Sequence, residues 1–206
     1  MKIKGEADKE YELCPAGNKV ATCIRIIDLG TQKVEWSGQV KHQRKAIISW
    51  ELPKELMADG RPFMISNRYT LSMFEKAKFR QHIESWRGTA FTKADLEEGF
   101  EPKNLIGKSC LLNLIHSEKS EKTYCNIASV SALPDGMEAP EQVNKTVFFS
   151  LDEFDSTTFG ELPDWMKELI SASPEYKAIM GEDSAEPQAK SESPSTAKPP
   201  EDEVPF

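Results

Sequence analysis

The sequence predicts a mainly β protein in which one amphipathic helix interrupts a series of strands. Segments rich in β-branched and aromatic residues recur along the first 135 residues and end at glycine or proline. One stretch near the middle repeats its apolar residues at helical spacing, and beyond residue 181 the composition changes to acidic residues, serine, alanine and proline. These three observations indicate a β domain, a short extension and a tail.

Three strands are expected before the helix, at residues 18–30, 42–52 and 62–73. The second of them is stopped by Pro53, because proline cannot donate a ladder hydrogen bond. The segment 31–41, between the first two strands, is polar and carries one glycine and one tryptophan. It is therefore expected to form a long loop or ribbon.

The helix is expected over residues 73–87. Ser72 and Glu75 match a capping box, in which each side chain satisfies a backbone donor at the helix start. Gly88 follows as the residue that ends the helix. One face of this helix is apolar and carries Phe79, Ile83 and Trp86.

Two further strands, at residues 107–116 and 122–133, are expected to form a hairpin after the helix. Three strands, a helix and two strands follow each other in an OB-fold, a five-stranded Greek-key barrel with its helix between strands three and four. An SH3-like barrel would lack the long helix, and a ferredoxin-like fold would need a helix after the first strand. An OB-fold domain is therefore expected over residues 1–135.

Residues 136–180 are expected to pack outside the barrel as a C-terminal extension with two short helices, at 163–171 and 173–180. Covering a barrel end and forming a subunit interface are the two roles considered for this extension. Residues 181–206 contain no large apolar residue before Val204. They therefore cannot bury enough apolar surface to offset the conformational entropy that is lost when a chain becomes ordered. They are predicted to form a disordered acidic tail.

The net charge of −8 is distributed unevenly along the chain. Residues 1–135 contain 21 Lys and Arg against 18 Asp and Glu, so the acidic excess lies in the C-terminal part. A mildly basic body is compatible with a nucleic-acid partner. No apolar run approaches the roughly 18 residues of a membrane span, and no export signal is recognised. A cytoplasmic protein without a membrane partner is expected.

The sequence contains no pattern typical of catalysis or of cofactor binding. Phosphate-binding glycine loops, HExxH and GxSxG are absent, and the histidines fall in different expected elements. Cys14, Cys23, Cys110 and Cys125 are expected to be buried free thiols; a metal held by Cys110, His116 and Cys125 would match no zinc spacing. We therefore expect no enzyme, no cofactor and no metal site, with a metal-dependent nuclease as the alternative.

Basic and aromatic residues fall where an OB-fold holds a single strand. Such a fold binds across its second and third strands, flanked by the loop after strand one and the loop between strands four and five. Basic side chains there contact phosphates and aromatic rings stack on bases. The alternatives are a core position for Tyr69, a capping position for Trp36 and ordinary solvated positions for the basic residues. The predicted DNA contacts are Trp36, Lys41, His42, Arg44, Lys45, Arg68, Tyr69, Lys122 and Tyr124.

The tail carries a second candidate site at its tip. An aromatic ring beside a carboxylate is a compact handle, because a basic pocket can bind the carboxylate while an apolar pocket binds the ring. A tail that only improves solubility is the alternative, but solubility does not require a terminal phenylalanine. The predicted partner-binding tip consists of Asp202, Glu203, Val204, Pro205 and Phe206.

The tip sequence EDEVPF resembles the acidic tip of bacterial single-stranded DNA-binding proteins. The body is similar to small bacteriophage proteins encoded among replication or recombination genes, in the segments CPAGNKVATCIRIIDLGTQ, ISWELP, GRPFMISNRYTLSMFEKA and FRQHIESWRG. The body departs from the bacterial pattern, so only the tip residues are carried over by position.

The resemblance implies a phage-encoded protein that protects single-stranded DNA, without strong sequence preference, during replication and recombination in the host cytoplasm. Its tip would recruit host or phage replication and repair enzymes. The small basic excess of the body predicts modest affinity per chain, so coating is expected to need cooperativity or a homo-oligomer. The alternative is a host-interaction protein that imitates the tip without binding DNA.

Overall fold

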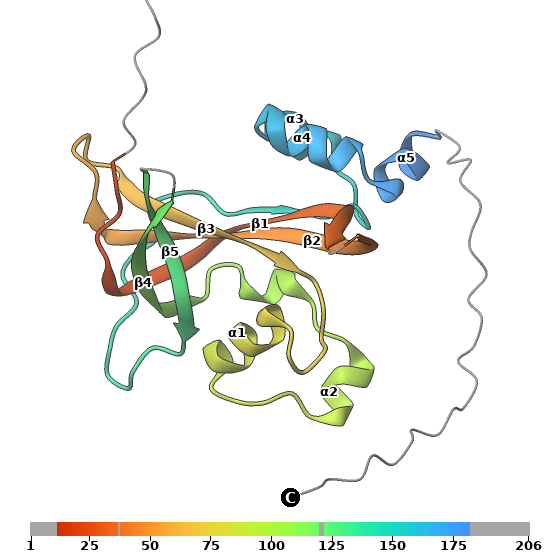
Figure 1. Cartoon of the computed structure of the whole chain (residues 1–206). Helices are drawn as coiled ribbons and strands as arrows, with labels where there is room; N and C mark the ends of the chain where they lie inside the picture. Colours follow the sequence, from red (N-terminus) through yellow and green to blue (C-terminus); the bar gives the residue numbers. More distant parts are fainter. Residues whose placement is uncertain (1–11, 37, 120–121, 182–206) are drawn as a thin grey trace, which may run out of the picture.

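The computed structural model describes residues 12–36, 38–119 and 122–181. The described chain is mainly β, as predicted (Figure 1). Its strands are β1 (Gly17–Trp36), β2 (Gln39–Leu56), β3 (Pro62–Thr70), β4 (Ser109–Lys119), β5 (Lys122–Ser131) and β6 (Val147–Phe149). Its helices are α1 (Lys78–Arg87), α2 (Lys93–Glu98), the 3-10 turn η1 (Pro102–Leu105), α3 (Ser156–Glu161), α4 (Asp164–Ser171) and α5 (Pro174–Met180).

The strands form an open sheet in the order β3-β2-β1-β4-β5, with all of these neighbours antiparallel and β6 added parallel to β1. β1 is long enough to pair with two strands: Gly17 to Thr22 pairs with β4, and Thr22 to Trp36 pairs with β2. Consequently the β1–β2 hairpin and the β4–β5 hairpin project from opposite ends of β1 (Figure 1).

Helix α1 fills the space between the two outer strands of the sheet. It contacts both β3 and β5, and the Trp86 indole donates a hydrogen bond to the Ser109 carbonyl at 2.9 Å. The backbone N–H of Ala132 donates to the Ser85 carbonyl at 3.1 Å. Its apolar face, predicted from helical spacing, is buried in the first core of the protein, which also contains Trp50.

A second core lies on the opposite face of the β1–β2 pair, where α3, α4 and α5 pack (Figure 1). Ile27, Leu29 and Ile47 of the sheet are buried against Phe149, Leu151, Leu162, Met166 and Ile170. Polar contacts fix the position of α4 and α5 on β1. Glu175 accepts hydrogen bonds from the backbone N–H and the hydroxyl of Thr31, and Gln32 donates to the Leu169 carbonyl at 2.9 Å. The helices therefore cover much of this face of the β1–β2 pair.

Two local predictions needed correction. The helix begins at Lys78 and not at residue 73, and its cap position, Ala77, makes no side-chain cap bond. The capping box of Ser72 and Glu75 is wrong, because the Ser72 hydroxyl accepts from the backbone N–H of Phe74 in a tight turn instead. The prediction that Pro53 stops the second strand is also wrong, because β2 runs on to Leu56. Pro53 lies in an irregularity between Leu52 and Leu56, where pairing with β3 is interrupted and a missing N–H costs no ladder bond. The segment 31–41 forms a ribbon, one of its two predicted forms, with the strands paired out to Trp36 and Gln39.

Gly30 is expected to be intolerant of any side chain. It lies at an irregularity of β1 with φ +69°, and a Cβ there would lie 2.5 Å from Ser173 Cβ and 2.8 Å from Leu151 Cδ1. Gly30→Ala should lower the free energy of unfolding by about 2–4 kcal/mol, because backbone strain and overlap add. Urea unfolding followed by circular dichroism measures this loss.

Gly88 provides the matched control for that substitution. Its φ is also +69°, but a Cβ built on it meets nothing within 4 Å. Gly88→Ala should therefore cost only about 1–2 kcal/mol, the strain of the left-handed conformation alone. Equal losses of unfolding free energy in the two variants would contradict the close packing of Ser173 and Leu151 against Gly30.

Candidate nucleic-acid interface

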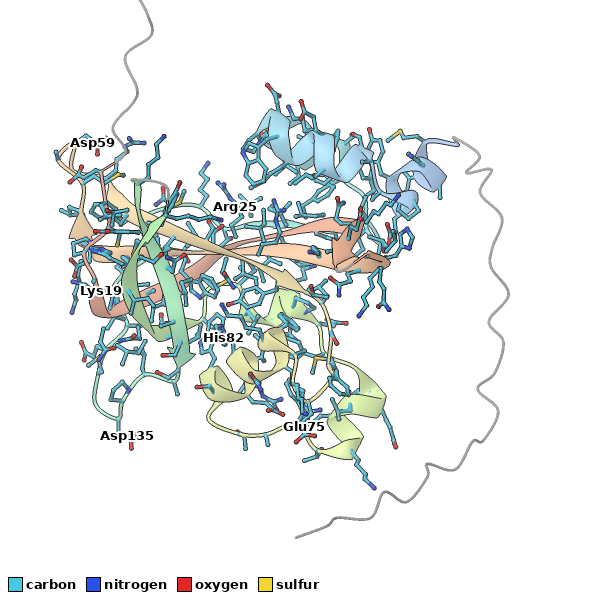
Figure 2. All side chains as sticks on the ribbon, viewed as in Figure 1. Lys19, Arg25, Asp59, Glu75, His82 and Asp135 are labelled. Carbon is cyan, nitrogen blue, oxygen red and sulfur yellow. The ribbon has the colours of Figure 1, made fainter. Side chains whose placement is uncertain are left out.

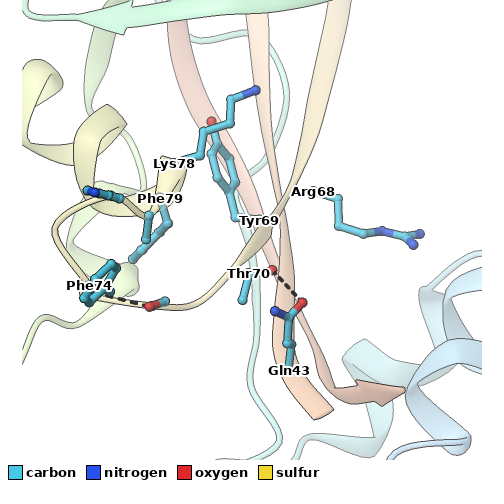
Figure 3. Close-up of a pocket in the computed structure, with 10 residues that line it drawn as sticks. Gln43, Arg68, Tyr69, Thr70, Phe74, Lys78 and Phe79 are labelled. Carbon is cyan, nitrogen blue, oxygen red and sulfur yellow. Dashed lines mark hydrogen bonds between the residues drawn. The ribbon is translucent and has the colours of Figure 1, made fainter. Parts of the chain in front are cut away.

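A groove of about 430 Å³ lies where the chain leaves β3 and enters α1 (Figure 3). β3 ends at Thr70, and the turn before α1 holds Phe74 away from the core, with 68% of the residue exposed. The apolar face of α1 begins only at Phe79, which is buried. An exposed aromatic ring therefore stands beside a hollow of the surface.

Basic side chains flank this groove. Lys76 and Lys78 are exposed and line the groove together with Phe74. In Figure 3 the Lys78 side chain extends past Tyr69, and Arg68 extends from β3 on the side away from the Phe74 ring. None of these three cations forms a salt bridge with a carboxylate of the described residues. Their charges are therefore available to an anionic ligand.

Part of the predicted site lies next to this groove. Lys45 pairs with Thr70 across β2 and β3, and the Thr70 hydroxyl donates to the Gln43 side chain at 3.3 Å. Lys41, Gln43 and Lys45 alternate along one face of β2, so a row of polar and basic side chains leads from the ribbon to the groove. Lys41, Lys45 and Arg68 thus lie in one row on the neighbouring strands β2 and β3.

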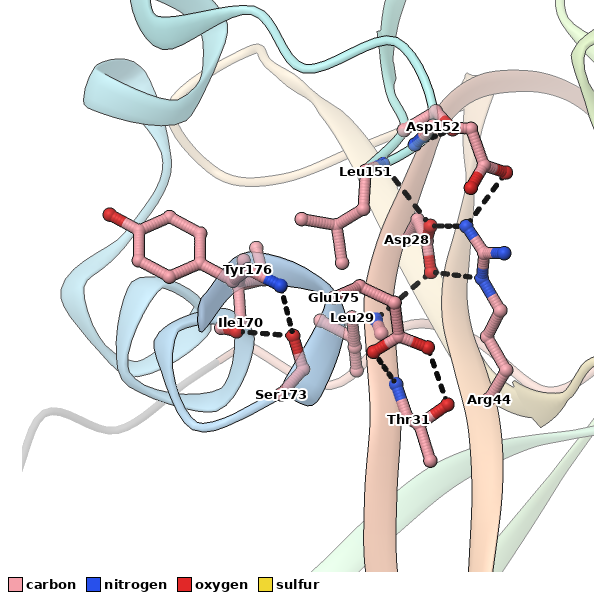
Figure 4. Close-up of polar contacts among 12 residues, drawn as sticks. Asp28, Leu29, Thr31, Arg44, Leu151, Asp152, Ile170, Ser173, Glu175 and Tyr176 are labelled. Carbon is pink, nitrogen blue, oxygen red and sulfur yellow. Dashed lines mark hydrogen bonds and ion pairs between the residues drawn. The ribbon is translucent and has the colours of Figure 1, made fainter. Parts of the chain in front are cut away.

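Two of the predicted contacts have partners within the protein. Tyr69 is only 3% exposed, and its hydroxyl is hydrogen-bonded to His82 Nδ1 at 2.8 Å, so its ring lies in the core and cannot stack on a base. Arg44 is bound by Asp28 on β1 and by Asp152 beyond β6 (Figure 4). The core position of Tyr69 is the alternative that the alternation along β3 predicts. No sequence pattern predicts the ion pairs of Arg44, because Asp28 and Asp152 are distant from it along the chain.

The remaining predicted contacts lie away from the groove. Lys122 and Tyr124 are exposed on the β4–β5 hairpin, at the other end of β1 from the ribbon. His42 is exposed on the ribbon, opposite Lys33. The side chain of Trp36 and the whole tip, 202–206, lie outside the described part of the protein.

Phe74, Lys76 and Lys78 were missed because the turn was assigned to the helix. A signal was present in the sequence. Phe74 precedes Phe79 by five residues, which in a helix would place it about 140° from the apolar face. A large aromatic residue outside that face was thus a candidate for exposure.

The segment between β5 and β6 restricts where a ligand can bind the sheet. Glu51 on β2 is fully buried and accepts hydrogen bonds from the backbone N–H groups of Val143 and Asn144, at 2.8 and 2.9 Å. The same face of β3 stays open at Met64, Ser66 and Arg68, which are exposed. The open surface therefore runs from β3 into the groove.

His82 gives the domain a predictable dependence on pH. It lies between α1 and the sheet (Figure 2), where burial, and secondarily the charge of Lys78, lower its pKa to about 4. Because the folded pKa is below the unfolded value near 6.5, the stabilisation is complete above pH 6.5 and is lost as the pH falls toward 4.

Between pH 7.5 and 5.5 the wild type should lose about 1 kcal/mol through this residue, a value reduced for its partial exposure. Urea unfolding at the two pH values measures the loss. His82→Gln should remove the pH dependence, whereas a variant of the exposed His42, His42→Gln, should retain it. An unchanged dependence in His82→Gln would contradict this assignment.

Comparison with known proteins adds no relative. No protein-family model matches the chain, and no curated protein matches it in sequence. None of the helices in the described ranges is long and apolar enough to cross a membrane.

Proposed function

We propose that the protein binds and protects single-stranded DNA, and that its five main strands form an OB-type barrel. The order β3-β2-β1-β4-β5, with α1 between β3 and β4 in sequence, supports this fold, since the OB-fold is a partly open Greek-key barrel with its helix at that position. Contacts of α1 with both β3 and β5 support a barrel that is closed by this helix between its two outer strands.

The groove between β3 and α1 is the observation that carries the functional proposal. The exposed Phe74 ring can stack on a base, and Lys76 and Lys78, which line the same groove, can neutralise phosphates. A duplex keeps its bases inside the helix, so a stacking ring selects single strands. Neither a stacking ring nor a lysine distinguishes the four bases strongly, so the binding has little sequence preference.

The bound strand would follow the uncovered surface. From the groove it would continue along Arg68 and Lys45 toward Lys41 on the ribbon, the row of cations left open by the C-terminal helices. The β4–β5 hairpin lies too far along the sheet to share this path without a longer strand. Lys122 and Tyr124 therefore belong to a secondary contact in this proposal.

The biological setting follows the resemblance of the sequence. A phage-encoded protein of this kind would coat single strands during replication and recombination in the host cell. Its acidic tip, 202–206, would recruit host or phage replication and repair enzymes through a basic pocket with an apolar floor. Cooperativity or a homo-oligomer would raise the modest affinity of one chain.

A titration with fluorescent oligo-dT tests this function. Oligo-dT should bind tightly and duplex DNA weakly, and log K should fall with log salt concentration at a slope of about −0.7 per neutralised phosphate. Equal affinity for duplex and single strands would contradict the proposal.

Removal of residues 199–206 separates the two proposed activities. The shortened protein should bind oligo-dT as well as the full chain or better, because acidic residues compete with DNA for the basic groove. It should lose capture of host primase or nucleases in a pull-down. Partner capture by a full chain that binds no single strand would favour the alternative, a protein that imitates the host tip.

A further inference from the structure

A second cavity of about 330 Å³ lies on the other side of the segment that joins β3 to α1. It shares Ser72 and Phe79 with the groove, so the two hollows are neighbours. Phe100 and Phe148 add aromatic surface to its walls, and its polar end is formed by Arg44 and Asp152. Its volume falls at the lower end of the range typical of ligand pockets, about 300–1,000 Å³.

The polar end is held rigidly by Asp28. This buried carboxylate accepts from Arg44 Nε at 3.3 Å and from Nη2 at 2.5 Å, and also from the backbone N–H groups of Gly30 and Leu151 (Figure 4). Arg44 Nη2 in turn donates to Asp152 Oδ2 at 2.8 Å. The guanidinium thus fixes the orientation of the Asp152 carboxylate.

Unused hydrogen-bonding capacity remains at this end. Asp152 is 69% exposed on its side chain, and within the described residues its Oδ1 accepts no hydrogen bond and Arg44 Nη1 donates none. Two carboxylates surround one guanidinium, so the cluster carries an excess of negative charge and will not hold a phosphate. The cavity therefore suits a flat, neutral ring with N–H donors.

We propose that this cavity holds one base of the bound strand, with guanine preferred; the inference rests on the proposed function. Guanine is the base whose Watson–Crick edge presents two adjacent N–H donors, N1–H and N2–H. An ionised carboxylate accepts hydrogen bonds only and can take both. Arg44 Nη1 can donate to the neighbouring O6, while adenine, cytosine and thymine each offer Asp152 a single donor at that edge.

The contact adds a local preference to binding that is otherwise insensitive to sequence. A base in the neighbouring groove stacks on Phe74, and the next base can turn into the cavity, where aromatic walls replace its stacking partners. Lys103 lies over the Phe148 ring at 5.3 Å and can meet the phosphate that connects the two bases. Recognition of unstacked bases through their Watson–Crick edges is common for single strands.

The test compares three oligo-dA strands of about 12 nucleotides, with adenine, guanine or hypoxanthine at the centre. Hypoxanthine lacks only the N2 amino group of guanine. The wild type should bind the guanine strand about fivefold tighter than either other strand. Asp152→Asn should lose this preference, and Glu153→Gln, which changes an exposed carboxylate next to the cavity, should keep it.

Equal affinity for the three strands, with binding itself intact, would overturn the guanine site and leave the proposed function standing. Absence of binding to every strand would instead contradict the proposed function. In that case a titration with dGMP and dAMP, followed by NMR, decides the inference. Larger chemical-shift changes at the backbone amides of Arg44 and Phe148 with dGMP than with dAMP support the guanine site. The absence of this difference overturns it.

Discussion

Combined replacement of Phe74, Lys76 and Lys78 by alanine is expected to lower the affinity for oligo-dT by roughly a hundredfold. Loss of a stacking ring accounts for about 1–3 kcal/mol of binding free energy. Each lysine that neutralises a phosphate also contributes about 0.7 to the slope of log K against log salt concentration, so the slope should become less negative by about 1.4. Fluorescence titrations at several salt concentrations measure both quantities.

The fold should not be affected, because all three side chains are exposed. A matched control removes one exposed aromatic residue and two lysines from α4 and α5, with Trp165, Lys167 and Lys177 changed to alanine. This variant should bind oligo-dT within about twofold of the wild type, since surface charges far from the groove are screened by salt. Equal losses of affinity in the two variants would show that general charge, and not the groove, holds the strand.

Asp28→Ala is expected to lower the free energy of unfolding by about 3–5 kcal/mol. Asp28 is buried, with 6% of the residue exposed, and its carboxylate accepts hydrogen bonds from three segments: β1 at Gly30, β2 at Arg44 and the chain beyond β6 at Leu151. Its hydrogen bonds are the first cause of the raised pKa of Arg44. Without it, the half-buried guanidinium of Arg44 keeps only the exposed Asp152 as a partner, and two backbone N–H groups lose theirs.

Asp152→Ala is the control for this variant, because it removes the other carboxylate from the same guanidinium. Asp152 is exposed, so its loss should cost less than about 1 kcal/mol. Urea unfolding measures both variants. Similar losses would mean that Asp28 acts only as a surface ion pair and does not hold the second core to the sheet.

Much of the secondary structure could be predicted because its signals are local. The burial of Phe79, Ile83 and Trp86 depends only on their spacing along one helix. The expected strands likewise correspond to β1–β5, since β-rich segments and turn residues occur within a few positions of each other. The helix start failed because a capping-box pattern also fits a tight turn, and side-chain composition alone does not separate the two.

The candidate site was predicted less well, since its residues are connected only in three dimensions. Lys41, Lys45 and Arg68 were found because they lie on neighbouring strands with a predictable face. Arg44 has the same sequence signature as these residues, yet its charge is engaged by Asp28 and Asp152. Nothing in a run of residues reveals which basic side chain will meet a distant carboxylate.

Spacing and composition within the chain were sufficient to define a mainly β protein, its central helix, the mildly basic body and the acidic C-terminal part. Tertiary packing decided which part of the sheet surface stays open. Residues 147–170 bury Ile27, Leu29 and Ile47, and this leaves β3 and the groove at Phe74 as the accessible surface. The physical reason is that burial depends on contacts between segments more than a hundred residues apart, whereas sequence patterns report only on neighbours within a few turns.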